Sequence, residues 1–135
     1  MDPNQGGSVL ETARNMDFDD ELLERIQSVL RPGDEIYTLA IKRPNVITAI
    51  DQDGIWVRTL RSDSRRAGPQ LVPAWMIAKA WRHLQKTGVL SQAELLEDLN
   101  VKRSAFVIAL LSQFTGVTVR TTKPVVIELI DETKL

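Results

Sequence analysis

The chain of 135 residues contains no cysteine and a single histidine, His83. Without thiols the protein can form no disulfide, has no thiolate nucleophile and cannot bind zinc through sulfur. A single imidazole also excludes a metal site built from several histidines. We therefore expect neither a metal ion nor another cofactor.

Sequence motifs of several enzyme classes are missing as well. The seven glycines are scattered, so there is no Gly-rich phosphate loop, and no Gly-x-Ser-x-Gly segment occurs. Asp51 and Asp53 fall in a predicted turn, where turn chemistry explains them without a metal. Glu132-Thr133-Lys134 resembles the acid-x-lysine element of restriction-type nucleases. That element also requires an acidic residue upstream, and nothing in the sequence singles out Asp34 or Asp53 for this role. We predict a protein that is not an enzyme; metal-dependent cleavage abolished by Glu132→Ala would contradict this.

Long hydrophobic runs are absent too. No apolar stretch approaches the length that crosses a bilayer, and the N-terminus has neither the basic nor the apolar region of a signal peptide. We expect a cytoplasmic, prokaryotic protein with no membrane partner. The length fits one domain, and a composition of 43% hydrophobic and 26% charged residues is sufficient for a buried core.

Charge is distributed unevenly along the chain, although the net charge is only −1. Residues 1–35 carry nine acidic and three basic residues, a balance of −6, whereas residues 36–135 carry nine acidic and fourteen basic residues, a balance of +5. The basic part is compatible with a polyanionic partner or with an ordinary solvated surface. The sequence leaves both interpretations open.

Hydrophobic periodicity predicts an α+β fold in three parts. Residues 1–16 form a disordered or loosely ordered tail. Residues 17–72 contain an amphipathic helix from Asp17 to Leu30, a three-stranded antiparallel meander between Glu35 and Leu60, and a basic loop. Residues 73–135 pack against this meander, because three strands need a covering layer.

The C-terminal part contains three predicted helices and a hairpin. The first helix begins at Pro73 and ends near Thr87, before Gly88. Ser91-Gln92-Ala93-Glu94 is a capping box that starts the second helix. Asn100 occupies a tight turn, where asparagine tolerates the left-handed conformation. The third helix runs from Lys102 or Arg103 to Phe114, and two alternating β-runs follow, joined at Thr122-Lys123-Pro124.

This order resembles the winged helix-turn-helix superfamily, over the C-terminal half only. Apolar residues lie where that family buries them, at Leu95, Leu99, Val101, Phe106 and Ala109. The sequence departs from the pattern in two positions. Asn100 replaces the preferred glycine of the turn, and Leu96 replaces a preferred small residue. The resemblance implies a winged helix, a fold that most often places its third helix in a DNA major groove but also serves in protein docking.

A non-catalytic DNA-binding protein, in transcription regulation or as a specificity module in genome defence, is the function this resemblance favours. The third helix would read the major groove, the second helix would bind phosphate at its N-terminus, and the wing and the basic loop would supply counter-charge. The predicted DNA-binding residues are Lys102, Arg103 and Ser104 in the third helix, Ser91 and Gln92 in the second, Arg120 and Lys123 in the wing, and Arg61, Arg65 and Arg66 in the loop.

The third helix is unusually apolar for this role. Phe106, Ala109 and Leu110 suffice to fill a core, so Val107, Ile108 and Leu111 must be covered by something else. In one account the meander or the first helix covers them, and only Lys102, Arg103 and Ser104 protrude. In the other, a second copy or another protein covers them, and the chain is a protein-interaction module without nucleic acid.

Overall fold

The computed structural model describes residues 18–60 and 66–130. They form an α+β fold of helices and two antiparallel sheets. The elements, in chain order, are α2 (Asp20–Val29), β1 (Glu35–Tyr37), β2 (Pro44–Asp51), β3 (Gly54–Thr59), β4 (Gln70–Pro73), α4 (Ala74–Thr87), β5 (Val89–Ser91), α5 (Gln92–Glu97), α6 (Ser104–Leu111), β6 (Val117–Thr122) and β7 (Val125–Leu129).

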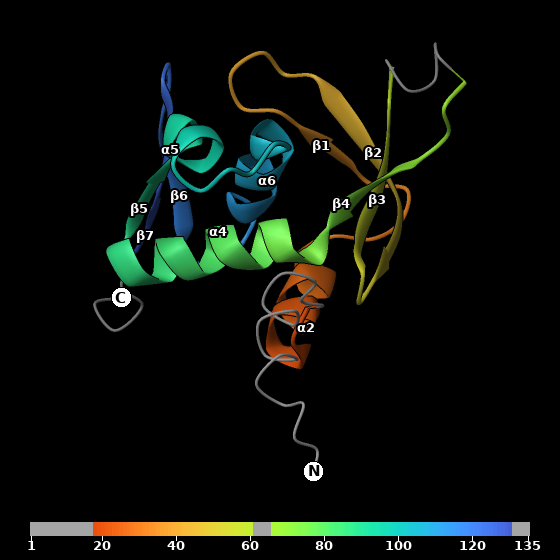
Figure 1. The fold of residues 1–135 in the computed structure, drawn as a ribbon, viewed down its shortest axis with the longest axis horizontal. Helices are drawn as coiled ribbons and strands as arrows, with labels where there is room; N and C mark the ends of the chain where they lie inside the picture. Colours follow the sequence, from red (N-terminus) through yellow and green to blue (C-terminus); the bar gives the residue numbers. More distant parts are fainter. Residues whose placement is uncertain (1–17, 61–65, 131–135) are drawn as a thin grey trace.

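The two sheets lie at opposite ends of the molecule, with α6 standing between them and α4 running along the base from one to the other (Figure 1). The first sheet has the strand order β1-β2-β3-β4, and the second has the order β5-β7-β6. The second sheet, α4, α5 and α6 all come from the C-terminal half. Helix α2 lies beneath the start of α4 (Figure 1).

Local signals place several boundaries where the sequence predicts them. The Asp53 amide donates to Asp51 Oδ1 at 2.9 Å, which is the turn chemistry expected between β2 and β3. Gly88 ends α4 with a φ of 83°, and Asn100 has a φ of 57°. These three predictions are confirmed. Helix α2 begins at Asp20 rather than at Asp17, because the Asp19 side chain accepts a hydrogen bond of 2.8 Å from the Leu22 amide and caps the helix there.

The capping box at the start of α5 is also confirmed. Ser91 Oγ accepts from the Glu94 amide at 3.0 Å, and Glu94 Oε1 accepts from the Ser91 amide at 3.4 Å. Two N–H groups that the helix itself leaves unsatisfied are bonded in this way.

The variant Ser91→Ala should therefore lower the free energy of unfolding by about 1 kcal/mol. Chemical denaturation measures this decrease. Ser28→Ala is the matched control, because the exposed Ser28 hydroxyl donates only to the Arg25 carbonyl of its own helix. Equal decreases in the two variants would contradict a capping role for Ser91.

Other elements differ from the prediction. Strands β4 and β5 were not expected, and Pro73, predicted as the first residue of a helix, is the last residue of β4 and the N-cap of α4. Both strands are short and form their hydrogen bonds with distant partners, β3 and β7. Helix α6 ends at Leu111 rather than Phe114, because the Gln113 and Phe114 amides bond to carbonyls three residues back and tighten the chain into a turn.

One hydrophobic core includes residues of both halves of the chain. Trp81 of α4 and Phe114 meet edge to face, with ring centroids 5.1 Å apart. The guanidinium carbon of Arg25 lies 5.0 Å from the Trp81 centroid, which places a cation from α2 against the same aromatic pair. The N-terminal segment is thereby attached to the C-terminal half.

Helix α6 is the centre of this core. Seven of its eight residues are buried, and the exception, Ala105, is half-buried. It packs against α4 and α5 on one side and against β1 on the other. The account in which the chain's own elements cover the extra apolar face is therefore confirmed for Val107, Ile108 and Leu111, each 0% exposed. The alternative, in which a second copy or another protein covers that face, is no longer supported.

Candidate functional site

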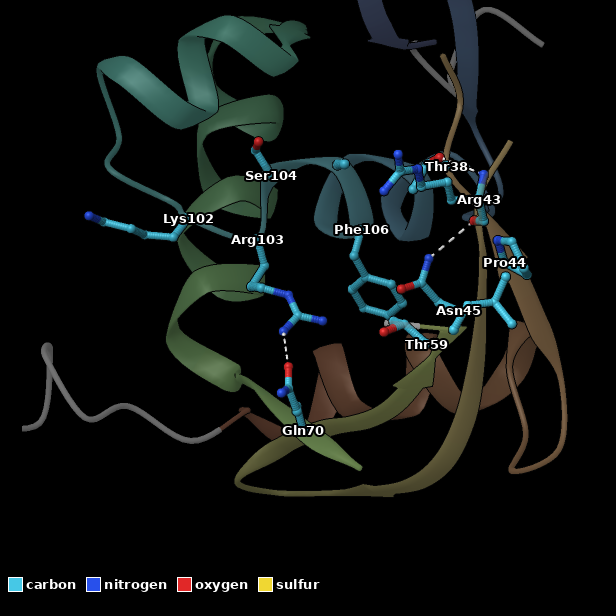
Figure 2. A pocket seen from close by; sticks show the side chains of 12 residues that line it. Thr38, Arg43, Pro44, Asn45, Thr59, Gln70, Lys102, Arg103, Ser104 and Phe106 are labelled. Carbon is cyan, nitrogen blue, oxygen red and sulfur yellow. Dashed lines mark hydrogen bonds between the residues drawn. The ribbon is translucent and has the colours of Figure 1, made fainter. Parts of the chain in front are cut away.

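A groove of about 640 Å³ opens between the first sheet and the N-terminus of α6. Its walls come from segments far apart in the sequence: the β1–β2 loop, the facing ends of β2, β3 and β4, and the start of α6 (Figure 2). The lining residues are Thr38, Arg43, Pro44, Asn45, Thr59, Leu60, Gln70, Lys102, Arg103, Ser104, Ala105 and Phe106.

The lining of the groove is cationic. Among the described residues it includes Arg43, Lys102 and Arg103 and no aspartate or glutamate. Neither Arg43 nor Lys102 forms an ion pair with a residue in the described ranges 18–60 and 66–130. Such a cavity favours an anion, because none of its described lining residues carries a negative charge.

Arg103 is held in place by the first sheet. Its Nη1 donates a hydrogen bond of 3.2 Å to Gln70 Oε1 at the start of β4 (Figure 2). The side chain is half-buried, and this reduced solvation lowers the pKa of Arg103 below its ordinary value. The guanidinium nevertheless remains charged at neutral pH. A bound anion would replace the solvation that the guanidinium loses on burial.

The start of α6 adds partial positive charge to the groove. Arg103 is the N-cap residue, and its side chain makes no capping hydrogen bond. The first N–H groups of the helix, at Ser104, Ala105 and Phe106, thus lack the side-chain acceptor that Ser91 supplies to α5. These three residues all line the groove. Uncapped amides at a helix N-terminus are a common place for phosphate and carboxylate groups.

Two polar residues of the first sheet shape the opposite wall. Thr38 Oγ1 accepts from the Arg43 amide at 2.9 Å and so closes the β1–β2 loop. Asn45 is only 5% exposed, and its Nδ2 donates to the Ile36 and Arg43 carbonyls, each at 3.3 Å. Its Oδ1 accepts no hydrogen bond from any described residue, and Figure 2 shows it turned toward Phe106.

Three of the predicted DNA-binding residues line the groove together, Lys102, Arg103 and Ser104. Lys102 is exposed, as expected. Ser104 is only 4% exposed, so the expectation that it protrudes is wrong. β1 packs against α6, so the body of this helix is not accessible to a DNA major groove.

The remaining predicted residues lie elsewhere. Arg120 and Lys123 are exposed in the β6–β7 hairpin, and Arg66 is exposed before β4. Arg61 and Arg65 fall outside the described residues, as does the Glu132-Thr133-Lys134 segment.

Ser91 and Gln92, predicted to bind phosphate, lie at the start of α5, a helix of six residues. The Ser91 hydroxyl is already bonded to the Glu94 amide, and the Glu94 carboxylate lies at the same helix end. An incoming phosphate would meet a negative charge there, so this part of the prediction is not supported by the geometry.

Sequence reasoning missed the groove residues of the first sheet, above all Arg43. The available signal was the cation pair Lys42-Arg43 directly before Pro44, at the start of a predicted strand. His83, the single histidine of the chain, is half-buried, with its Nε2 3.1 Å from Glu94 Oε2 of the neighbouring helix.

Comparison of the chain with protein-family models, with curated proteins and with solved structures found no match. Within the described part of the chain, no group of three or more histidine, aspartate or glutamate side chains is arranged to hold a metal ion. None of the helices described is long and apolar enough to span a bilayer.

Proposed function

We propose that the protein is a non-catalytic DNA-binding protein that grips the phosphate backbone at the cationic groove. The observation that carries this proposal is the lining itself, whose described residues combine three cations and the uncapped start of α6 with no carboxylate. Phosphate contacts of this kind supply most of the affinity of sequence-independent binding. Base reading by α6 is not part of the proposal, because that helix is buried.

The topology of the C-terminal half supports the same function. The order α4-β5-α5-α6-β6-β7, with β7 between β5 and β6, fits the predicted winged helix, in which the β6–β7 hairpin would be the wing. The turn of this hairpin, which contains Lys123, points to the same edge of the molecule as the β1–β2 loop, which contains Lys42 and Arg43 (Figure 1). Wing and groove would then contact the same stretch of backbone.

The first test is the salt dependence of binding to a labelled duplex of random sequence. Between about 50 and 200 mM salt the affinity should fall steeply. The double variant Arg43→Gln/Lys102→Gln should reduce the slope of log K against log [salt] by about 0.9 for each phosphate that the protein no longer neutralises. Fluorescence anisotropy measures both quantities.

Arg31→Gln/Lys86→Gln is the matched control. It removes the same number of charges from exposed positions that do not line the groove, and its slope should stay close to that of the unaltered protein. Absence of binding at low salt, or equal slopes for the two double variants, would contradict the proposed function.

A further inference from the structure

The cationic groove has a volume of about 640 Å³, within the range of roughly 300–1,000 Å³ that is usual for pockets that enclose small ligands. This volume exceeds what a single phosphate group fills. The groove therefore has room for a further part of the ligand beside the phosphate.

The groove combines positive charge with one fixed hydrogen-bond acceptor. Cations come from the start of α6 and from the β1–β2 loop, and uncapped amides come from the start of α6. Asn45 lies beside Phe106, and its Oδ1 accepts no hydrogen bond from a described residue. Asn45 is 95% buried and held by two hydrogen bonds through Nδ2, so this acceptor has a fixed direction. A fixed acceptor beside a phosphate-binding region suits a heterocycle with an N–H donor.

From this arrangement we propose that the groove receives one unstacked nucleotide. The phosphate would contact Arg43, Lys102 and Arg103, and the base would enter the groove with an exocyclic amino group donating to Asn45 Oδ1. A base inside a duplex is stacked and reaches a concave site only when it leaves the stack. The preferred partner is then DNA with an unpaired nucleotide, an inference that rests on the proposed function and specifies its target.

The experiment compares two labelled duplexes of one sequence, fully paired or carrying a single bulged adenosine. At one salt concentration the bulged duplex should bind about ten-fold more tightly or better, because its extra nucleotide needs little further unstacking. Ala105→Phe fills the groove at a half-buried lining position without altering its charge. It should abolish this preference, so that the variant binds the bulged and the paired duplex with equal affinity.

Ala93→Phe makes the same substitution at an exposed position of α5 outside the groove, and it should keep the preference. Equal affinities of the unaltered protein for the two duplexes would overturn the nucleotide site while leaving phosphate binding intact, and this comparison requires no variant to fold.

If neither duplex binds, the proposed function fails, and deoxyadenosine monophosphate then tests the groove directly against inorganic phosphate. Tighter binding of the nucleotide than of phosphate, abolished by Ala105→Phe, would support the nucleotide site for a free ligand. Equal or absent binding would overturn it.

Discussion

Gly54→Ala is expected to lower the free energy of unfolding by about 3 kcal/mol or more, because it adds backbone strain to a steric overlap. Gly54 begins β3 with a φ of 148°, a conformation that residues with a Cβ rarely adopt. A Cβ at this position would overlap the carbonyl oxygen of Val72 and would lie 2.9 Å from the Ala74 nitrogen. Both neighbours are backbone atoms at the β4–α4 junction, so neither can move aside as a flexible side chain would.

The decrease is large against the total stability of a small domain, about 5–15 kcal/mol. Denaturant unfolding measures it, with Gly33→Ala as the control. Gly33 also has a positive φ, 97°, but open space surrounds the position of its missing Cβ. That variant isolates the conformational cost, about 1–2 kcal/mol. Equal decreases in the two variants would show that β3 and β4 do not approach as closely at this point as the structure has them.

The close approach at Gly54 matters for the groove. Gly54 pairs with Pro73, and the same β3–β4 ladder runs on to the pair Val57–Gln70 at the groove end. Gln70 is the residue that accepts the hydrogen bond from Arg103. Disruption of this ladder would release Arg103 from the first sheet and weaken phosphate binding together with stability.

The features that the sequence predicted depend on neighbouring residues. A capping box, an Asx turn, a left-handed asparagine and an apolar helical face are all determined within a few positions, which is why α2, the Ser91 cap, the Asp51–Gly54 turn and Asn100 could be identified. Elements that depend on distant pairing could not. β4 and β5 have only four and three residues, and their hydrogen bonds come from β3 and β7.

The candidate site was predicted only in part for the same reason. Lys102 and Arg103 stand out in the sequence as cations before an apolar helix. Arg43, which lines the groove with them, lies in the β1–β2 loop, and no local pattern connects the two segments. The burial of Ser104 follows from the position of the first sheet over α6. The sequence left open whether this sheet or another protein covers the helix.

The variant Ile108→Ala tests directly whether the first sheet covers α6. It should lower the free energy of unfolding by about 2–5 kcal/mol, the usual range for an isoleucine truncated in a packed core. Ile108 is 0% exposed. It is not one of the three residues, Phe106, Ala109 and Leu110, that by themselves suffice to fill a core, so another element must cover it. If the first sheet moved away in solution and freed α6 for a major groove or a protein partner, Ile108 would face water and its truncation would change stability little.

The matched control is Ile41→Ala, the same truncation at an isoleucine that is 63% exposed in the β1–β2 loop. Its effect should stay within about 0.5 kcal/mol. Denaturant unfolding of both variants, with and without a saturating duplex, separates the two modes of binding. A large decrease for Ile108→Ala in the free protein, undiminished in the complex, means that α6 stays covered while DNA is bound, so contact is made at the groove. A decrease for Ile108→Ala as small as that for Ile41→Ala would show that α6 is exposed to solvent. Base reading by this helix would then explain DNA binding better than contact at the groove.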